Sequence, residues 1–369
     1  MRRILKSGGW AALLAVFVAL TGCATSFESG GTFAYVSNSE SKEIYVMRLA
    51  DNGDLDLVDK VALKAGGPST PMAVSPDNRY LYAAIRTEPF AVAAFAINPN
   101  GKLTQIGEAP LANSMAYIST DRTGKYLLTA SFGGHMISVN PIGLGGIPKG
   151  PHQTLASEKN AHAILTDPLN QFALVPCLGF DAVMQLRFDA ATGKLTPNEP
   201  ALMQVREKAG PRHLVFHPSG KYVYLLNELD GSVYVFTYDG SLGRLSLHQV
   251  TSALPAGFAF APPEKKIWAA DVHLTPNGKF LYTTERTSST ITSFKVGPDG
   301  ILSKIETVPT DKQPRGFNID PSGRYLLSVG QLSNTLTSYS INGETGKLTK
   351  LKEYPVGKNP NWVEIVTLP

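Results

Sequence analysis

The sequence predicts an all-β fold, a seven-bladed β-propeller of four-stranded blades, because one short pattern recurs six times along its 369 residues. Each copy has an apolar strand, a turn rich in Pro, Asp, Gly and Asn, an aromatic residue and a second apolar strand. The aromatic residues of the six copies are Tyr80, Tyr126, Phe172, Tyr222, Phe280 and Tyr325, at intervals of 46, 46, 50, 58 and 45 residues. A repeat of this length with about four short strands is typical of a propeller blade.

Each repeat contains four predicted strands, and residues 213–250 show all of them. HLVFH (213–217) precedes the turn and YVYLL (222–226) follows it. SVYVFTY (232–238) alternates apolar and polar residues, and GRLSLHQV (243–250) follows a second turn. The turns carry Asn-Gly, Asp-Gly and Ser-Gly, whose residues tolerate positive φ.

The two ends of the chain supply the parts of a seventh blade. FAYVSNS (33–39), EIYVMRL (43–49) and LDLVDKV (55–61) predict strands two to four without a first strand. NWVEIVTL (361–368) predicts a first strand with nothing after it. Pairing these pieces closes the ring and leaves no open blade at either end. We therefore assign residues 32–369 to the propeller domain.

The first residues predict an export signal. Arg2, Arg3 and Lys6 precede an apolar run over residues 10–20, which is too short for a typical membrane span. The ending Leu-Thr-Gly-Cys resembles a bacterial lipobox, whose cysteine becomes the lipidated N-terminus. This predicts a signal peptide over 1–22, lipidation of Cys23 and a tether over 23–31, in an exported, periplasmic protein anchored in the outer membrane. The alternative is an ordinary signal peptide with an incidental cysteine.

Composition limits the remaining function classes. The net charge of +4 falls to +1 once Arg2, Arg3 and Lys6 are removed, so nothing indicates nucleic-acid binding. Cys177 is the only cysteine besides Cys23, which excludes a disulfide within the mature chain, and its apolar surroundings predict a core residue. A domain of this size can bury a core without disulfides, and we expect a monomer.

Aligning the repeats on their turn proline brings polar residues into register. Six residues before the proline, where the first strand begins, stand His162, Arg212 and Arg315. Ten residues after it, where the second strand ends, stand Arg86, Glu228, Arg286 and Gln331. The first strand of each blade lines the channel and the second returns antiparallel to it, so these positions open at one mouth. His213, Asp271 and His273 are nearby, but strand alternation can turn them into the blade.

The excess of arginine predicts a mouth that binds an anion or an oxygen that becomes anionic. Arginine binds carboxylate and phosphate through paired hydrogen bonds and stays protonated. His162 has an ordinary pKa near neutrality, and a desolvated Glu228 is a second candidate base. The alternative is a salt-bridged rim that only ties the blades together. The histidine spacing does not indicate a metal site, and we expect neither metal nor organic cofactor.

Three long segments resemble one propeller family. GPRHLVFHPSGKYVYLLNELDGSVYVF (210–236), WAADVHLTPNGKFLYTTERTSSTITSF (268–294) and QPRGFNIDPSGRYLLSVGQLSNTLTSY (313–339) resemble the seven-bladed lactonases. That family includes bacterial cycloisomerase-type 6-phosphogluconolactonases and is related to fungal carboxymuconate lactonising enzymes. The resemblance implies lactone chemistry at the channel mouth. The His, two Arg and Glu of the lactonising enzymes fall by motif on His162, Arg212, Arg286 and Glu228. From the register of the repeats we further predict as substrate-binding residues Arg315, Arg86, His213, Asp271, His273 and Gln331.

The export signal departs from this family, whose phosphogluconolactonases are cytoplasmic. We therefore predict an exported lactonase that hydrolyses a sugar δ-lactone, either glucono-1,5-lactone-like or 6-phosphogluconolactone, with the unphosphorylated lactone favoured by location. Two other functions stay open. One is a lactone-closing cycloisomerase, and the other is a non-catalytic propeller used as a docking surface.

Overall fold

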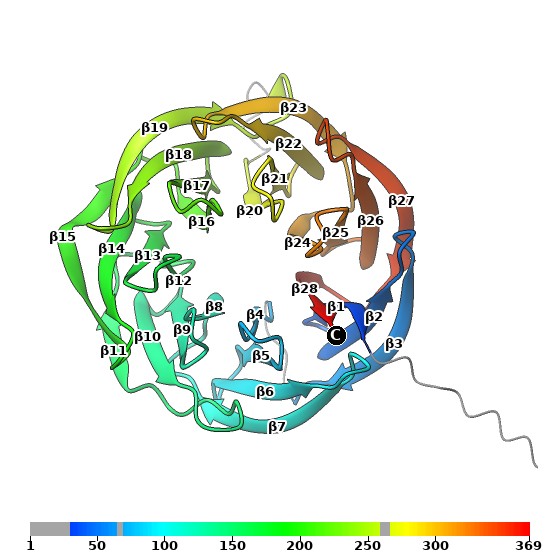
Figure 1. Ribbon diagram of the computed structural model, residues 1–369, viewed down its shortest axis with the longest axis horizontal. Helices are drawn as coiled ribbons and strands as arrows, with labels where there is room; N and C mark the ends of the chain where they lie inside the picture. The colour runs from blue at the N-terminus through cyan, green and yellow to red at the C-terminus, as the bar shows by residue number, and fades with distance from the viewer. Residues whose placement is uncertain (1–29, 65–68, 259–265) are drawn as a thin grey trace, which may run out of the picture.

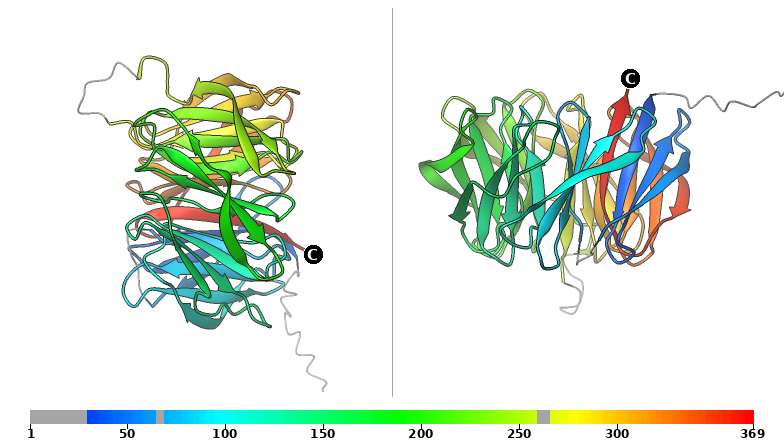
Figure 2. Two further views of the ribbon diagram at one scale, coloured as in Figure 1. Left: turned by 90° about the vertical axis from the view of Figure 1, so that its left-hand side faces the viewer. Right: turned by 90° about the horizontal axis from the view of Figure 1, so that it is seen from below.

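The structure, a computed structural model, is a ring of seven sheets, each of four antiparallel strands, around a central channel (Figure 1). It describes residues 30–64, 69–258 and 266–369. Figure 2 shows the ring from its sides, with the strands running between its two faces. This confirms the predicted fold class. No helix in these ranges is both long and apolar enough to cross a membrane.

The strands run from the channel outward in each blade, as follows. Blade 1 has β28 (Pro360–Leu368), β1 (Gly31–Asn38), β2 (Glu43–Leu49) and β3 (Leu55–Ala62). Blade 2 has β4 (Met72–Val74), β5 (Tyr80–Ile85), β6 (Ala91–Ile97) and β7 (Leu103–Pro110). Blade 3 has β8 (Tyr117–Thr120), β9 (Tyr126–Ser131), β10 (Met136–Pro141) and β11 (Gln153–Ala156). Blade 4 has β12 (Leu165–Thr166), β13 (Phe172–Cys177), β14 (Ala182–Asp189) and β15 (Lys194–Gln204).

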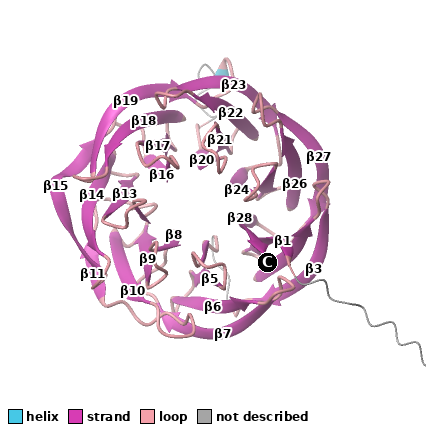
Figure 3. Cartoon of the chain, in the orientation of Figure 1, coloured by secondary structure: helices cyan, strands magenta, loops and turns pink. Residues whose placement is uncertain are grey.

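The remaining three blades follow the same order. Blade 5 has β16 (Pro211–Phe216), β17 (Tyr222–Asn227), β18 (Ser232–Asp239) and β19 (Arg244–Ser252). Blade 6 has β20 (Ala269–Leu274), β21 (Phe280–Glu285), β22 (Thr290–Val296) and β23 (Leu302–Pro309). Blade 7 has β24 (Pro314–Ile319), β25 (Tyr325–Gly330), β26 (Thr335–Ile341) and β27 (Leu348–Pro355). Figure 3 shows that strands account for nearly all of the ring.

The ring closes through the two ends of the chain, as the sequence predicts. β28 pairs antiparallel with β1, with Gly31 opposite Leu368 and Asn38 opposite Pro360. The innermost strand of blade 1 is therefore the last strand of the protein. Because every inner strand begins at the same mouth of the channel, Gly31 and Leu368 lie at the opposite face of the ring (Figure 2).

The recurring turn explains why Gly or Asn stands at its fourth residue. In blade 5 the N–H of Gly220 donates to the carbonyl of His217 at 2.8 Å, which closes the turn. The equivalent residues in all six repeats have positive φ, from 56° to 72°: Asn78, Gly124, Asn170, Gly220, Gly278 and Gly323. In most residues the Cβ clashes with the backbone at positive φ, whereas Gly and Asn adopt this conformation readily.

The aromatic residue after each turn packs against the next blade. Its ring covers a positive-φ glycine in the turn between the third and fourth strands of that blade, where a Cβ would lie within 2.6 Å of the ring. The pairs are Tyr80–Gly146, Tyr126–Gly193, Phe172–Gly243, Tyr222–Gly300, Phe280–Gly346 and Tyr325–Gly53. Phe33 against Gly101 completes the ring with a seventh pair, which the sequence pattern did not single out. One contact type therefore joins all seven blades.

The apolar core lies between neighbouring blades rather than in one centre. Phe33 and Tyr35 of blade 1, for example, cluster with Leu81 and Phe95 of blade 2. Cys177 is fully buried in the cluster between blades 3 and 4, and burial raises the pKa of its thiol to about 12. It is therefore a core residue, as predicted.

The inner strand of blade 4 is shorter than the sequence pattern suggests. β12 contains only residues 165 and 166, and His162 precedes it in an irregular segment. The partner strand β13 carries Pro176, which has no N–H to donate to a longer β12. The backbone N–H of His162 still donates to the Pro176 carbonyl at 2.9 Å, which holds the segment at the mouth.

Candidate active site

The predicted mouth residues lie where inner strands begin and second strands end. Arg212 is the second residue of β16, and Glu228 follows the last residue of β17. The register of both β16 and β24 shifts at its start, at Arg212 and at Arg315 respectively. Such a bulge changes the direction of a side chain relative to the ordinary alternation of a strand. As a result, the neighbours Arg212 and His213 turn toward each other, with Arg212 Nη1 3.2 Å from His213 Nε2.

Glu228 binds two arginines from two blades. Its Oε2 accepts hydrogen bonds from Arg212 Nε at 2.8 Å and from Arg286 Nη2 at 2.7 Å. Burial favours the neutral carboxyl, but the charges of Arg286, Arg212 and Arg315 outweigh it and lower the pKa of Glu228. Glu228 is therefore ionised and fixes both guanidinium groups.

Both arginines are buried and held on several sides. Arg212 is 1% exposed, and its Nη1 donates to the carbonyl of Ala270. Arg286 donates to the carbonyls of Trp268 at 3.0 Å and Ala269 at 3.1 Å. Burial and the charge of Arg212 lower the pKa of Arg286 to about 9, so it remains charged at neutral pH.

Trp268 completes this group, although the sequence analysis did not select it. Its indole Nε1 donates to Glu228 Oε1 at 3.0 Å, and its ring lies 3.9 Å from the guanidinium carbon of Arg286. Its backbone N–H donates to Glu285 at 2.7 Å. Trp268 lies just before β20 and has no equivalent in the recurring pattern. The one sequence signal that pointed to it was its place as the first residue of the lactonase-like segment 268–294.

His162 lies beside the arginines without a hydrogen bond to its ring in the described ranges. Its Nδ1 is buried and unpartnered, and its ring packs edge-on against His213 at 5.1 Å and Phe132 at 5.8 Å between centroids. Burial, then the charges of Arg212, His213 and Arg315, hold the pKa of His162 well below 6.5. This corrects the expectation that His162 titrates near neutrality. Protonating its ring would add a further positive charge beside these arginines, which is costly.

Arg315 and Arg86 carry the positive charge that Glu228 does not balance. Arg86 donates to Ser114 at 3.0 Å and to Ser69 at 2.6 Å, and burial lowers its pKa to about 10. Arg315 has no hydrogen bond or ion pair in the described ranges. Burial and the charges of Arg212, Arg286 and Arg86 lower its pKa well below the ordinary value. The cluster therefore favours a bound anion or oxyanion.

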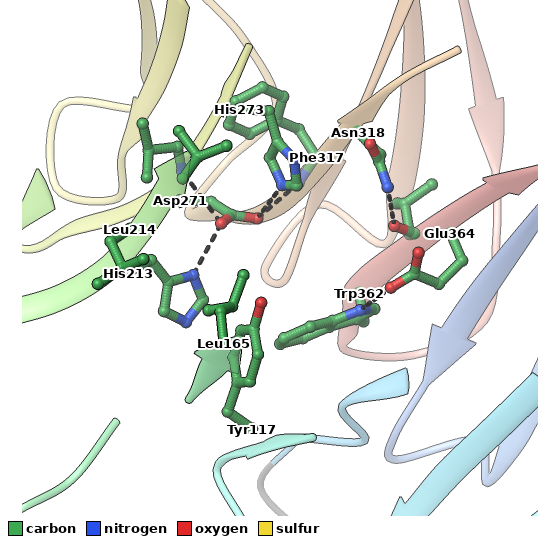
Figure 4. Close-up of a pocket in the computed structure, with 13 residues that line it drawn as sticks. Tyr117, Leu165, His213, Leu214, Asp271, His273, Phe317, Asn318, Trp362 and Glu364 are labelled. Carbon is green, nitrogen blue, oxygen red and sulfur yellow. Dashed lines mark hydrogen bonds and ion pairs between the residues drawn. The ribbon is translucent and has the colours of Figure 1, made fainter. Parts of the chain in front are cut away.

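His213, Asp271 and His273 line the channel rather than the blade interior (Figure 4). Asp271 Oδ1 lies 2.8 Å from His213 Nδ1, and its Oδ2 lies 3.3 Å from His273 Nε2. These contacts outweigh burial and keep the pKa of Asp271 well below its usual range. The register of β20 shifts between Ala269 and Val272, which explains why Asp271 departs from simple alternation.

One predicted mouth residue, Gln331, makes its hydrogen bond outside this cluster. The Gln331 amide donates to Asn359 Oδ1 at 2.7 Å, in the segment before β28, rather than contacting an arginine. Cys23, the signal segment and most of the tether lie outside the described residues. Within the described ranges, no group of three or more His, Cys, Asp or Glu residues is arranged to hold a metal ion.

Comparison with known proteins agrees with this architecture. Residues 22–365 match the family described as lactonase, seven-bladed β-propeller. The chain is 44% identical over 333 residues to a 6-phosphogluconolactonase of Serratia proteamaculans, which covers 90% of this chain and 98% of that protein. It is 41% identical to a 6-phosphogluconolactonase of Yersinia pestis, with 90% and 97% covered.

Solved structures agree as well. The periplasmic gluconolactonase of Pseudomonas aeruginosa superposes with a TM-score of 0.82 at 26% identity, over 92% of this chain and 100% of that one. A Bacteroides fragilis protein assigned as a 6-phosphogluconolactonase gives the same TM-score and identity, over 93% of this chain and 99% of that one. The chain therefore belongs to the family of seven-bladed β-propeller lactonases.

Proposed function

We propose that this protein hydrolyses an unphosphorylated sugar δ-lactone outside the cytoplasm, with no metal or organic cofactor. Family membership supports lactone hydrolysis in sugar metabolism. The lipobox-like segment that ends at Cys23 supports export, and one structural relative is a periplasmic gluconolactonase. Oxidation of aldoses outside the inner membrane produces lactones of this kind, which carry no phosphate.

The arginines bind the carbonyl of the lactone in this proposal. Arg315 has no hydrogen-bond partner in the described ranges, and Glu228 fixes Arg212 and Arg286 beside it. Water attack converts the carbonyl oxygen into an oxyanion, and the uncompensated positive charge then stabilises the tetrahedral intermediate. A fixed donor of this kind contributes about 3 kcal/mol to transition-state stabilisation.

One contrast between the two candidate bases supports His162. Glu228 already accepts three hydrogen bonds, from Arg212, Arg286 and Trp268. A carboxylate so occupied, with a lowered pKa, is a weak base and a good anchor. His162 is neutral, and its ring nitrogens bind no described residue. We therefore assign the base to His162 and the positioning of the arginines to Glu228.

The proton moves in a closed cycle. Water adds its oxygen to the carbonyl carbon and passes one proton to His162. The developing oxyanion offsets the positive charge of the imidazolium, which opposes the effect of the arginines on its pKa. When the intermediate collapses, the ring C–O bond breaks and His162 returns the proton to the departing alkoxide. The product is an open-chain hydroxy acid.

A second candidate substrate is 6-phosphogluconolactone. The curated relatives named above carry that name, and Arg315 is a buried cation without a counterion in the described ranges. A substrate phosphate would pair with it. The cluster's charge is compatible with both lactones, so compartment decides between them in this proposal.

The test compares initial rates on glucono-1,5-lactone and its 6-phosphate, with spontaneous ring opening subtracted. We expect kcat/KM for the two substrates to lie within about a hundredfold, or roughly 2.7 kcal/mol. A larger preference for the phosphate would overturn the proposed substrate. Arg212→Met and Arg286→Met should each lose most activity while still folded. Because removing one member of a buried ion pair also costs about 3–5 kcal/mol of stability, rates are compared below each variant's unfolding midpoint. Loss of activity only through unfolding would instead favour the salt-bridged rim.

The same assay separates the other functions. A cycloisomerase would convert a carboxylated muconate and leave gluconolactone at its spontaneous rate. A docking propeller would accelerate neither reaction. Either result would overturn lactone hydrolysis as the activity of this site.

A further inference from the structure

The channel contains a cavity of about 180 Å³ beyond the arginine cluster. Its wall comes from the middle of inner strands in several blades, chiefly Tyr117, His213, Asp271, His273, Trp362 and Glu364 (Figure 4). It adjoins a wider region of about 310 Å³ that shares Tyr117, Leu165, Trp362 and Glu364 and reaches Arg122 near the end of β8. Because inner strands begin at the arginine mouth, this region extends toward the opposite face.

His213 separates this cavity from the arginine cluster. On one side, its ring nitrogens lie 3.3 and 3.2 Å from Arg212 Nη1. On the cavity side, its ring packs edge-on against Tyr117 at 5.2 Å and Trp362 at 6.0 Å between centroids. The 2.8 Å contact with Asp271 fixes its orientation. A molecule in the cavity is therefore a different occupant from one at the arginines.

Glu364 and the Tyr117 hydroxyl are the polar groups in this wall with the fewest protein partners. Glu364 Oε1 accepts a hydrogen bond from its neighbour Trp362 Nε1 at 2.8 Å (Figure 4). In the described ranges its Oε2 has no hydrogen bond and its carboxyl forms no ion pair, and the Tyr117 hydroxyl also has no hydrogen bond. Burial raises the pKa of Glu364 to about 7, so the carboxyl both donates and accepts near neutral pH. Polar groups arranged in this way favour a polar ligand.

We propose that this cavity is a second ligand site, which takes one neutral, hydroxyl-rich ring of pyranose size. The cavity is small beside sites for drug-sized ligands, which measure roughly 300–1,000 Å³. Trp362, Tyr117 and Phe317 offer apolar ring surface to the C–H groups of a sugar. Glu364, Tyr117 and His273 offer hydrogen bonds to its hydroxyls.

Charge and polarity exclude the other ligand classes. An anion would meet the ionised Asp271 and the partly ionised Glu364. A cation would have to displace His213 and His273, whose rings lie against the two carboxylate oxygens of Asp271. An apolar ligand would leave Glu364 and Tyr117 without partners, at a cost typical of buried polar groups. This inference does not depend on the proposed lactone substrate.

The probe is 1,5-anhydroglucitol, which has the ring and hydroxyls of glucose but no carbonyl to bind at the arginines. Saturation-transfer NMR and calorimetric titration should detect binding to the full-length protein. Glu364→Gln and Tyr117→Phe should each weaken it about tenfold with unchanged unfolding midpoints. Arg315→Gln, in the arginine cluster, is the matched control and should leave it unchanged.

Three outcomes would overturn the proposal. One is no binding of the probe by wild type. A second is binding lost in Arg315→Gln and kept in Glu364→Gln and Tyr117→Phe, which would place the probe at the arginines. The third is glucosamine binding more than tenfold tighter than the probe, which would make this a cation site.

Discussion

The indole of Trp268 donates a hydrogen bond to Oε1 of Glu228 across 3.0 Å, while Oε2 of that carboxylate accepts from two arginines. The same ring stacks on the guanidinium of Arg286 at 3.9 Å. One side chain therefore contacts both members of an ion pair that joins two blades. Because Trp268 is 39% exposed, its role is to orient these groups more than to fill the core.

Removing the Trp268 contacts stepwise should reduce activity stepwise. Trp268→Phe keeps a ring for stacking but loses the donor to Glu228, and hydrogen bonds to charged groups contribute about 1.5–3 kcal/mol. We expect kcat to fall at least about tenfold. Trp268→Leu also loses the stacking contact and should be slower still. Both variants should keep the wild-type unfolding midpoint, and equal, full activity would contradict the positioning role.

The lowered pKa of His162 predicts a flat pH profile near neutrality. The neutral ring is the active form, so a pKa well below 6.5 moves the acid limb of kcat/KM below that pH. Rates corrected for spontaneous opening should therefore change little between about pH 6 and about pH 8. An acid limb with its midpoint between pH 6 and pH 7 in wild type would contradict the burial of this ring among arginines.

Substitution of the two candidate bases should separate their roles. His162→Asn removes the proton acceptor and should lower the rate by about a hundred- to ten-thousand-fold. Glu228→Gln removes the charge that orients Arg212 and Arg286 but leaves the base. Its activity should fall with the shape of the pH profile kept. The opposite pattern, in which only Glu228→Gln abolishes the acid limb, would assign the base to Glu228.

Adjacent glycines test the contact that joins the blades. Gly145 and Gly146 both have φ of 81°, but a Cβ on Gly146 would lie 2.4 Å from the Tyr80 ring, whereas one on Gly145 meets nothing within 4 Å. Gly145→Ala should cost only the conformational strain, about 1–2 kcal/mol. Gly146→Ala should cost about 1–3 kcal/mol more because the ring must move. If urea titration gave Gly145→Ala and Gly146→Ala equal unfolding free energies, the Tyr80 ring would be able to move aside at no cost.

Replacement of Cys23 by Ser tests the predicted anchor. If Cys23 is lipidated, wild type should fractionate with membranes and Cys23→Ser should be soluble in the periplasm. Since Gly31 pairs with Leu368 at the face opposite the arginines, the anchored enzyme should present its mouth away from the membrane. Wild type and Cys23→Ser should then hydrolyse lactone at equal rates. A wholly soluble wild type would contradict the anchor.

The sequence by itself determined the seven blades, their closure and the convergence of most mouth residues. Those features depend on local rules that repeat: residues of positive φ in each turn, and an aromatic residue after it. Antiparallel pairing then places the start of one strand beside the end of the next. Arg212 and Glu228 could be matched in advance because this register is a property of the hairpin.

Only the tertiary structure decided which groups touch and how they are charged. Trp268 and Phe33 lie outside the six-fold pattern, so their partners Glu228 and Gly101 depend on the path of the whole chain. The bulge at Arg212 overrides the alternation that would have turned His213 into the blade. The lowered pKa of His162 comes from charges on other blades, and such charges act through space, where sequence separation carries no information.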